Sequence, residues 1–247
     1  MFNREEREIE KKNREQHLGS SLITLLDPMS VVSEQFRTIR TNIQFAMVEH
    51  NYRSLMFTSS GAWEGKSMVA SNVAVSMSHL DNFRVLFIDG DLRKPTAHKT
   101  FDIHTRRGLT TYLTDRSVDY MSVTQYIPEA NLYVIPAGPT PPNPAELLSS
   151  ERMHELLAET GKMFDLVIID TPPILVVTDA QLIANVTDAA VFVLREGVAQ
   201  RRDIYKSKLL LDKANAKTIG VVYNGAEGNA VNSYYGYGYG DDLRLDD

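Results

Sequence analysis

The stretch TSSGAWEGKSM, residues 58 to 68, follows the apolar run LMFTS and precedes a helical pattern. Its second half matches the phosphate-binding pattern G-x-x-x-x-G-K-[ST] at Gly65, Lys66 and Ser67. Ser60 stands where the first glycine is expected, and the bulky Trp63 lies in the middle of the loop. A phosphate-binding loop lies between a strand and a helix, and this stretch is predicted to have that position. The alternative interpretation is a surface turn in which the sequence GKS occurs by chance.

The chain on both sides of this loop alternates between short apolar runs and helical patterns. The runs are LMFTS, RVLFIDGD, NLYVIPAG, FDLVIID, AAVFVL and TIGVVYN, and helices are expected from about residue 67, near 149–161 and near 201–214. Continuous Val, Ile and Leu runs between helices indicate strands that are covered on both faces. The sequence therefore predicts an α/β fold with a doubly wound, mainly parallel sheet flanked by helices, a Rossmann-like three-layer sandwich of the P-loop NTPase type.

Three segments are expected along the chain. Residues 1–29 form a charged N-terminal segment, with five charges of each sign between Arg4 and Glu15, and residues 30–224 form the nucleotide-binding domain. Residues 225–247 form a tyrosine-rich tail that its Gly, Asn and Asp content predicts to be flexible. Within residues 31–45, one helical face carries apolar side chains and is expected to pack on the core: Val32, Phe36, Ile39 and Ile43.

Composition excludes several functional classes. The chain has 247 residues, 43% of them hydrophobic, which is enough for one large domain with a substantial core. A net charge of −6 argues against nucleic acid as a partner. The absence of cysteine excludes disulfides, thiolate zinc sites and iron–sulfur clusters. No apolar run approaches the roughly 18 residues that cross a bilayer, so a role at a membrane is expected to depend on a partner.

Carboxylates follow two of the predicted strands. Asp89 and Asp91 come directly after VLFI, and Asp170 comes after LVII. Ligands in doubly wound sheets lie beyond the carboxyl ends of the strands, and carboxylates buried there are costly unless a cation meets them. Each aspartate alone has a turn or a helix cap as its alternative role. Together with the Lys–Ser pair they predict a magnesium site made by Ser67, Asp89 and Asp170.

The loop is expected to hold the phosphates of a nucleotide through its backbone N–H groups and the positive end of the helix dipole. Lys66 would bridge the β- and γ-phosphates, and the Ser67 hydroxyl would ligate Mg²⁺. Trp63 is compatible with phosphate binding by the loop if its φ is negative and its ring projects outward, which leaves its amide free to face phosphate. The ring would then cover the site or contact a partner. The expected nucleotide-binding residues of the loop are Ser60, Gly61, Ala62, Trp63, Glu64, Gly65, Lys66, Ser67 and Met68.

The loop, the motif VLFIDGDLRKP and the motif LVIIDTPP together resemble the bacterial P-loop tyrosine kinases of capsule and exopolysaccharide loci, over roughly residues 30 to 240. Members of that family usually read P-G-E-G-K-[ST], so Ala62 and Trp63 depart from the pattern. The resemblance implies ATP and Mg²⁺ as ligands and Asn224 as an adenine contact. It implies four catalytic residues, among them a base near the incoming tyrosine: Lys66, Asp89, Asp91 and Asp170. Arg93 is expected to pair with Asp91 or with the substrate.

Two motifs outside the nucleotide site strengthen the resemblance. EQFRTIR has the E-x-x-R-x-x-R spacing by which these kinases assemble into rings, and its charged positions are Glu34, Arg37 and Arg40. These three lie largely away from the apolar helix face and point to solvent or to another subunit, solvated charge being the commoner outcome. YYGYGYG provides a cluster of tyrosines for autophosphorylation, with a low-complexity tail as the alternative: Tyr234, Tyr235, Tyr237 and Tyr239.

The resemblance thus implies a protein-tyrosine autokinase that phosphorylates the tail of a neighbouring copy in a ring and regulates polysaccharide synthesis and export. The implied partners are a membrane-embedded polysaccharide co-polymerase that activates the kinase, a cognate phosphotyrosine phosphatase and further copies of the chain. The implied location is the cytoplasm, at the inner face of the cell membrane. One alternative is a partition or septum-positioning ATPase, although those proteins usually carry a lysine where Gly61 stands. The other is a nucleotide-gated scaffold in which Trp63 has disabled catalysis.

Overall fold

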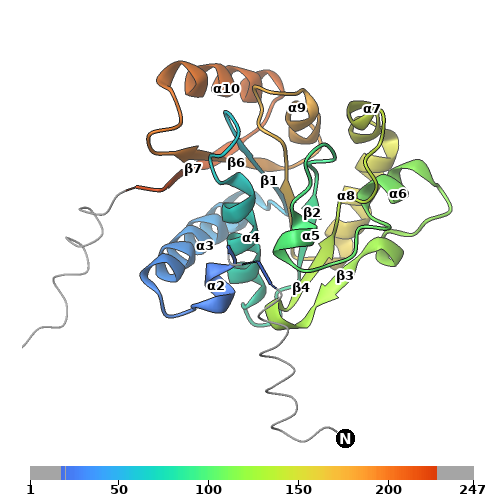
Figure 1. Cartoon of the computed structure of the whole chain (residues 1–247), viewed down its shortest axis with the longest axis horizontal. Helices are drawn as coiled ribbons and strands as arrows, with labels where there is room; N and C mark the ends of the chain where they lie inside the picture. Colours follow the sequence, from blue (N-terminus) through green and yellow to red (C-terminus); the bar gives the residue numbers. More distant parts are fainter. Residues whose placement is uncertain (1–17, 20, 227–247) are drawn as a thin grey trace, which may run out of the picture.

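A seven-stranded sheet lies at the centre of the computed structural model, which describes residues 18, 19 and 21–226, and helices pack on both of its faces (Figure 1). The strands are β1 Ser54–Ser59, β2 Val85–Asp89, β3 Gln125–Ile127, β4 Leu132–Ile135, β5 Leu166–Asp170, β6 Ala189–Arg195 and β7 Thr218–Asn224. Their order across the sheet is β3-β4-β2-β5-β1-β6-β7. Among these strands, β3 pairs antiparallel with β4 and the other pairings are parallel. The predicted doubly wound, mainly parallel α/β fold is confirmed.

The sheet separates two apolar clusters, and helices pack against each of its faces to form them. The described α-helices are α2 Ile23–Leu26, α3 Val31–His50, α4 Lys66–Ser78, α5 Ala97–Thr100, α6 Leu109–Thr114, α7 Pro144–Leu148, α8 Glu151–Met163, α9 Asp179–Ala184 and α10 Arg201–Lys213, with 3₁₀ turns η1 Tyr120–Val123 and η2 Pro128–Ala130. In β1, Leu55 and Phe57 face the cluster with α3 and α4, while Met56 faces the cluster with α8 and α10. This alternation along one strand produces the three layers.

Helix α3 packs its apolar face on α4, largely as predicted. Its N-terminus is capped by Ser30, whose hydroxyl accepts from the Ser33 N–H. Phe36 and Ile43 are buried in the apolar cluster on this face of the sheet, and Ile39 packs against it. Val32 is exposed and does not belong to this cluster. The predicted face is therefore right in its middle and C-terminal turns and wrong at Val32.

The packed core begins earlier in the chain than the expected boundary at residue 30. Leu18 and Leu22 belong to the cluster beneath α3 and α4. Asn72 of α4 holds this segment, because its side-chain carbonyl oxygen accepts from the Thr24 N–H at 2.9 Å and its amide donates to the Ser21 carbonyl at 2.6 Å. These bonds tie the segment before α3 to the helix that starts at the phosphate-binding loop.

The edge strand β7 departs from the prediction that the strands are covered on both faces. Each of its residues is exposed or half-buried, and Val221 and Tyr223 are each 57% exposed. It lies at the end of the sheet with a neighbour on one side only, so the apolar run TIGVVY does not signify full burial. The short strand β3 and the short helices α5, α6, α7 and α9 were also not predicted, since none is long enough to show a period.

No helix in the described part of the chain has the length and apolar character to cross a membrane.

Candidate active site

The loop between β1 and α4 has the backbone conformation of a phosphate-binding loop. Gly65 has φ +87°, and a Cβ at this position would lie 2.2 Å from the Asn224 side-chain nitrogen. Glycine is therefore required at residue 65 both by the backbone conformation and by the close approach of Asn224. Helix α4 begins at the next residue, so Lys66 and Ser67 occupy its first turn, where N–H groups lack helical acceptors.

Trp63 adopts a left-handed conformation, with φ +68°. The condition of a negative φ, under which a tryptophan would fit the loop without strain, is therefore not met. The expectation of an outward ring is confirmed, since the side chain is 86% exposed. Ser60, by contrast, has no positive φ, so a serine in place of the first glycine adds no backbone strain.

Three side chains make hydrogen bonds to the backbone of the loop: Glu64, Asn224 and Arg195. The buried Glu64 carboxylate accepts from the Gly61 N–H at 2.6 Å, and burial raises its pKa. The Asn224 amide donates to the Glu64 carbonyl at 3.0 Å. Arg195 donates to the Trp63 carbonyl at 3.2 Å. Arg195 was not predicted, although a charged residue that ends an apolar strand is the signal that drew attention to the aspartates.

Lys66 reaches two carboxylates, one at the end of β5 and one in the loop that follows β2. Its ammonium lies 3.0 Å from the Ser67 hydroxyl, 3.4 Å from a carboxylate oxygen of Asp170 and 3.7 Å from one of Asp91. All three charged side chains are largely buried. Burial raises the pKa of Asp170, and the opposing attraction of Lys66 is the next cause. The structure thus brings together Lys66 and Asp170, which are 104 residues apart in sequence. They meet beyond the carboxyl ends of the strands, where the sequence predicted the site.

Asp89 lies beside Asp170 in register on β2 and β5, but it faces backbone donors instead of Lys66. One oxygen accepts from the N–H groups of Thr96 and Ala97 at 3.0 and 2.9 Å, and the other accepts from the Asp91 N–H at 3.3 Å. Burial, followed by the charge of Asp170, raises the pKa of Asp89 to about 7. Asp91, and not Asp89, is therefore the second carboxylate at the lysine.

Arg93 pairs with Asp179, which the sequence did not single out. The guanidinium makes two bonds to this carboxylate, at 2.8 and 3.1 Å, and Asp179 is fully buried. The Arg93 backbone N–H, in turn, donates to Asp91 at 3.3 Å. Of the two expected roles, pairing of the Arg93 side chain with Asp91 is wrong, since that side chain links the loop after β2 to α9.

The residues at Lys66 fit a nucleotide-bound Mg²⁺ better than a metal ion held by protein alone. Nowhere in the described residues do three His, Asp or Glu side chains gather closely enough to hold a metal by themselves. Mg²⁺ in nucleotide sites is usually held by one or two carboxylates together with phosphate oxygens and water. The Ser67 hydroxyl and the Asp170 carboxylate offer that donor set, with Asp89 in the neighbouring strand.

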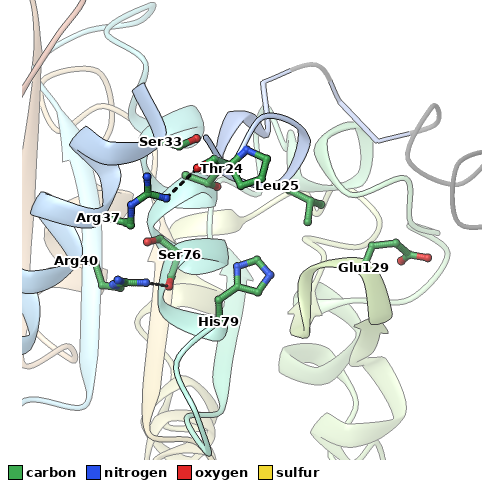
Figure 2. Close-up of a pocket in the computed structure, with 9 residues that line it drawn as sticks. Thr24, Leu25, Ser33, Arg37, Arg40, Ser76, His79 and Glu129 are labelled. Atoms are coloured by element: carbon green, nitrogen blue, oxygen red, sulfur yellow. Dashed lines mark hydrogen bonds between the residues drawn. The ribbon is translucent and has the colours of Figure 1, made fainter. Parts of the chain in front are cut away.

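Two residues of the expected ring motif, Arg37 and Arg40, line a separate pocket between α3, α4 and the α2 segment, with a volume of about 370 Å³. Glu34 and Arg37 form an ion pair within α3, and Arg37 also donates to the Pro28 carbonyl at 2.9 Å. Figure 2 shows Arg40 turned toward α4, where it donates to the Ser76 carbonyl at 3.0 Å. Arg40 is thus directed partly into its own subunit, and not only to solvent or another subunit.

The expected autophosphorylation sites Tyr234, Tyr235, Tyr237 and Tyr239 lie outside the described residues.

Comparison with known proteins defines the class first. The family model of ParA, described as the NUBPL iron-transfer P-loop NTPase, matches residues 53–233. A cell-division ATPase, MinD of Pyrococcus furiosus, aligns over 72% of this chain and 74% of its own, with a TM-score of 0.61 and 21% identity, a likeness of fold alone. The chain is therefore a P-loop NTPase with the ParA-type fold.

Closer relatives narrow the class. The tyrosine-protein kinase YwqD of Bacillus subtilis is 44% identical over 92% of this chain and 94% of its own length. The kinase domain of the Escherichia coli tyrosine kinase ETK aligns with a TM-score of 0.80 and 32% identity, over 89% of this chain and 86% of that domain. The chain belongs to the bacterial P-loop tyrosine kinases.

Proposed function

We propose that this chain is an ATP-dependent protein-tyrosine autokinase that phosphorylates its tail tyrosines in trans within a ring and so regulates capsular or extracellular polysaccharide synthesis and export. The observation that carries the proposal is the contact of Lys66 with Asp170, which ends β5, and with Asp91, in the loop after β2. The chain also shares 44% identity with a tyrosine kinase over 92% of its length. The acceptors are the four tyrosines at 234, 235, 237 and 239.

Phosphoryl transfer depends mainly on positioning and on neutralising charge. Lys66 leaves its carboxylate partners to hold the β- and γ-phosphates of ATP, while loop N–H groups and the α4 N-terminus hold the phosphates from below. The Ser67 hydroxyl and the Asp170 carboxylate would hold Mg²⁺, which would neutralise phosphate charge. Asp91 positions Lys66 before ATP binds, through its contact with the ammonium at 3.7 Å.

Asp89 is the proposed base. Its two oxygens offer about four acceptor positions, of which three bind N–H groups, so one lone pair remains for a proton. A pKa of about 7 suits a base that works near neutral pH. The γ-phosphoryl group passes from ATP to the phenol oxygen, the phenol proton passes to Asp89, and ADP leaves. Asn224 is proposed to contact the adenine, since it ends β7 next to the loop.

The same proposal includes the assembly of the kinase. Glu34, Arg37 and Arg40 are proposed to join neighbouring copies, because the Glu34–Arg37 pair is only partly buried and the two arginines border an open pocket. The proposed activator is a membrane-embedded polysaccharide co-polymerase, which would hold the kinase at the inner face of the membrane. A phosphotyrosine phosphatase is proposed to reverse the modification. The proposed division is a kinase domain over 30–224, on which the end of the charged segment 1–29 packs through Leu18 and Leu22, and a tail from 225.

The decisive experiment uses Lys66→Met, with ATP and Mg²⁺ added and phosphotyrosine detected on the purified protein. Lys66→Met is expected to lose phosphorylation and keep its circular dichroism spectrum, while the matched control Lys208→Met, at an exposed position, keeps both. Retained phosphotyrosine on Lys66→Met would remove the proposed site. Nucleotide binding without phosphotyrosine in the wild type would favour a nucleotide-gated scaffold instead.

Transfer between copies is tested by mixing. A chain that keeps Lys66 but has all four tail tyrosines changed to phenylalanine is mixed with the Lys66→Met chain, whose tail is intact. Phosphotyrosine on the Lys66→Met chain is expected, because the intact active site and the four proposed acceptors then lie on different copies. No phosphotyrosine in the mixture, beside a phosphorylated wild type, would show that transfer occurs within one copy.

A further inference from the structure

Trp63 is the one tryptophan of the chain, and its conformation is costly. Its φ of +68° places a bulky residue in the left-handed region, and its side chain is 86% exposed to water. Such strain persists mainly where a site uses it. Neither packing nor the fold accounts for an indole at this position, since glycine would adopt the same backbone conformation without strain.

The order of the strands fixes the direction in which a nucleotide lies. Ligands of this fold bind beyond the carboxyl ends of the strands. On one side of β1 the strands β5 and β2 end in Asp170 and Asp89, which mark the end where Mg²⁺ and the γ-phosphate belong. On the other side β6 and β7 end in Arg195 and Asn224, which are neighbours in register. The base of the nucleotide therefore extends toward β6 and β7.

Trp63 belongs to the base side of the loop. Its carbonyl accepts from Arg195, and the carbonyl of the next residue, Glu64, accepts from Asn224. Arg195 also lies against Gly225, where a Cβ would come within 3.6 Å of the arginine side chain. The backbone around Trp63 is thus held by the two side chains that end β6 and β7, at the place toward which a base extends.

We propose that the indole of Trp63 stacks on the purine ring of the bound nucleotide and adds affinity that the phosphates alone do not provide. The inference rests on the proposed nucleotide site and extends it to the base. Stacking of an aromatic side chain on a base gains binding energy without hydrogen bonds. The phenol of an acceptor tyrosine is a less suitable partner, because it must approach the γ-phosphate on the side of β5 and β2.

The test compares ADP with inorganic pyrophosphate, which carries the two phosphates without a base, by isothermal titration calorimetry with Mg²⁺. The variants are Trp63→Leu, which keeps a branched apolar side chain, and Trp63→Phe, which keeps an aromatic ring. Both keep a Cβ at the strained position, so loop strain is matched. Trp63→Leu is expected to bind ADP about 5- to 100-fold more weakly, with Trp63→Phe recovering most of the loss and the affinity for pyrophosphate unchanged.

Fluorescence provides a second readout, because Trp63 is the sole tryptophan. Its emission in the wild type is expected to be quenched by ADP and not by pyrophosphate. Equal ADP affinity of wild type and Trp63→Leu would overturn the stacking. An equal loss of ADP and pyrophosphate binding would also overturn it, since the residue would then act through the loop. If the wild type binds neither ligand, the proposed nucleotide site itself fails. Loss of activation by a membrane partner in Trp63→Leu, at unchanged ADP affinity, would assign the indole to that partner and overturn the proposal.

Discussion

Replacement of Asp89 by asparagine tests the electrostatics of the acidic strand ends. Asp89 is fully buried, next to Asp170, and its pKa is raised from 3.8 to about 7 by burial and then by that neighbour. A carboxyl group whose pKa is higher in the folded state than in the unfolded state stabilises the fold while it is protonated. This contribution is fully present below about pH 4 and is lost as the pH rises through about 7.

The magnitude follows from the two pKa values. Between pH 5 and pH 8, ionisation of a group with pKa 3.8 in the unfolded chain and about 7 in the folded chain lowers the free energy of unfolding by about 2–3 kcal/mol. Asparagine has the same shape and does not ionise. Its amide loses an acceptor toward the Asp91 N–H, which lowers stability by an amount that does not change with pH.

The assay is urea unfolding of wild type and Asp89→Asn at several pH values from 5 to 8, without nucleotide or Mg²⁺. The quantity of interest is the difference between the two free energies of unfolding. The stability of Asp89→Asn relative to wild type is expected to increase by about 2–3 kcal/mol from pH 5 to pH 8. Asp212→Asn, at a half-exposed position on α10, is the control and is expected to show no such trend. A flat or falling difference for Asp89→Asn would refute a raised pKa.

Three further variants test single contacts. Gly65→Ala is expected to lose ADP affinity and about 1–3 kcal/mol of stability, because its φ is +87° and its Cβ would overlap the Asn224 amide. A melting temperature like that of Gly61→Ala, where a Cβ would make only an ordinary contact with the Glu64 carboxylate at 3.6 Å, would contradict this. Arg93→Leu is expected to lower the free energy of unfolding by about 3 kcal/mol, since it leaves Asp179 buried and unpaired, and the double variant with Asp179→Leu should recover most of it; a double variant less stable than the single would count against the pairing. When Glu34, Arg37 and Arg40 are all replaced by alanine, sedimentation is expected to show monomers. An unchanged oligomer would mean that these three charged residues do not join copies.

The amino-acid sequence by itself determined the type of fold and predicted the place of the candidate site. Continuous apolar runs such as LVIID and VLFID identify buried parallel strands, because side chains that alternate between the two faces of a sheet are all apolar only when both faces are covered. The GKS triplet after a strand located the phosphate-binding loop, and the aspartates that end two strands indicated an acidic site beside it. These are local patterns, which depend on residues a few positions apart.

Tertiary structure decided which side chains meet. Arg93 binds a carboxylate 86 positions away, and Arg195 and Asn224 hold a loop more than 130 positions away, so no local pattern could assign these partners. The φ of Trp63 is set by the path of the loop between β1 and α4, which overrides the preference of a tryptophan for negative φ. β7 reads like a buried strand, but its position at the edge of the sheet leaves it exposed. Asp89 faces backbone N–H groups and not Lys66, because the chain after β2 turns back over its carboxylate before α5 begins. In each case the outcome depends on where a distant part of the chain lies, and that is fixed only when the layers pack together.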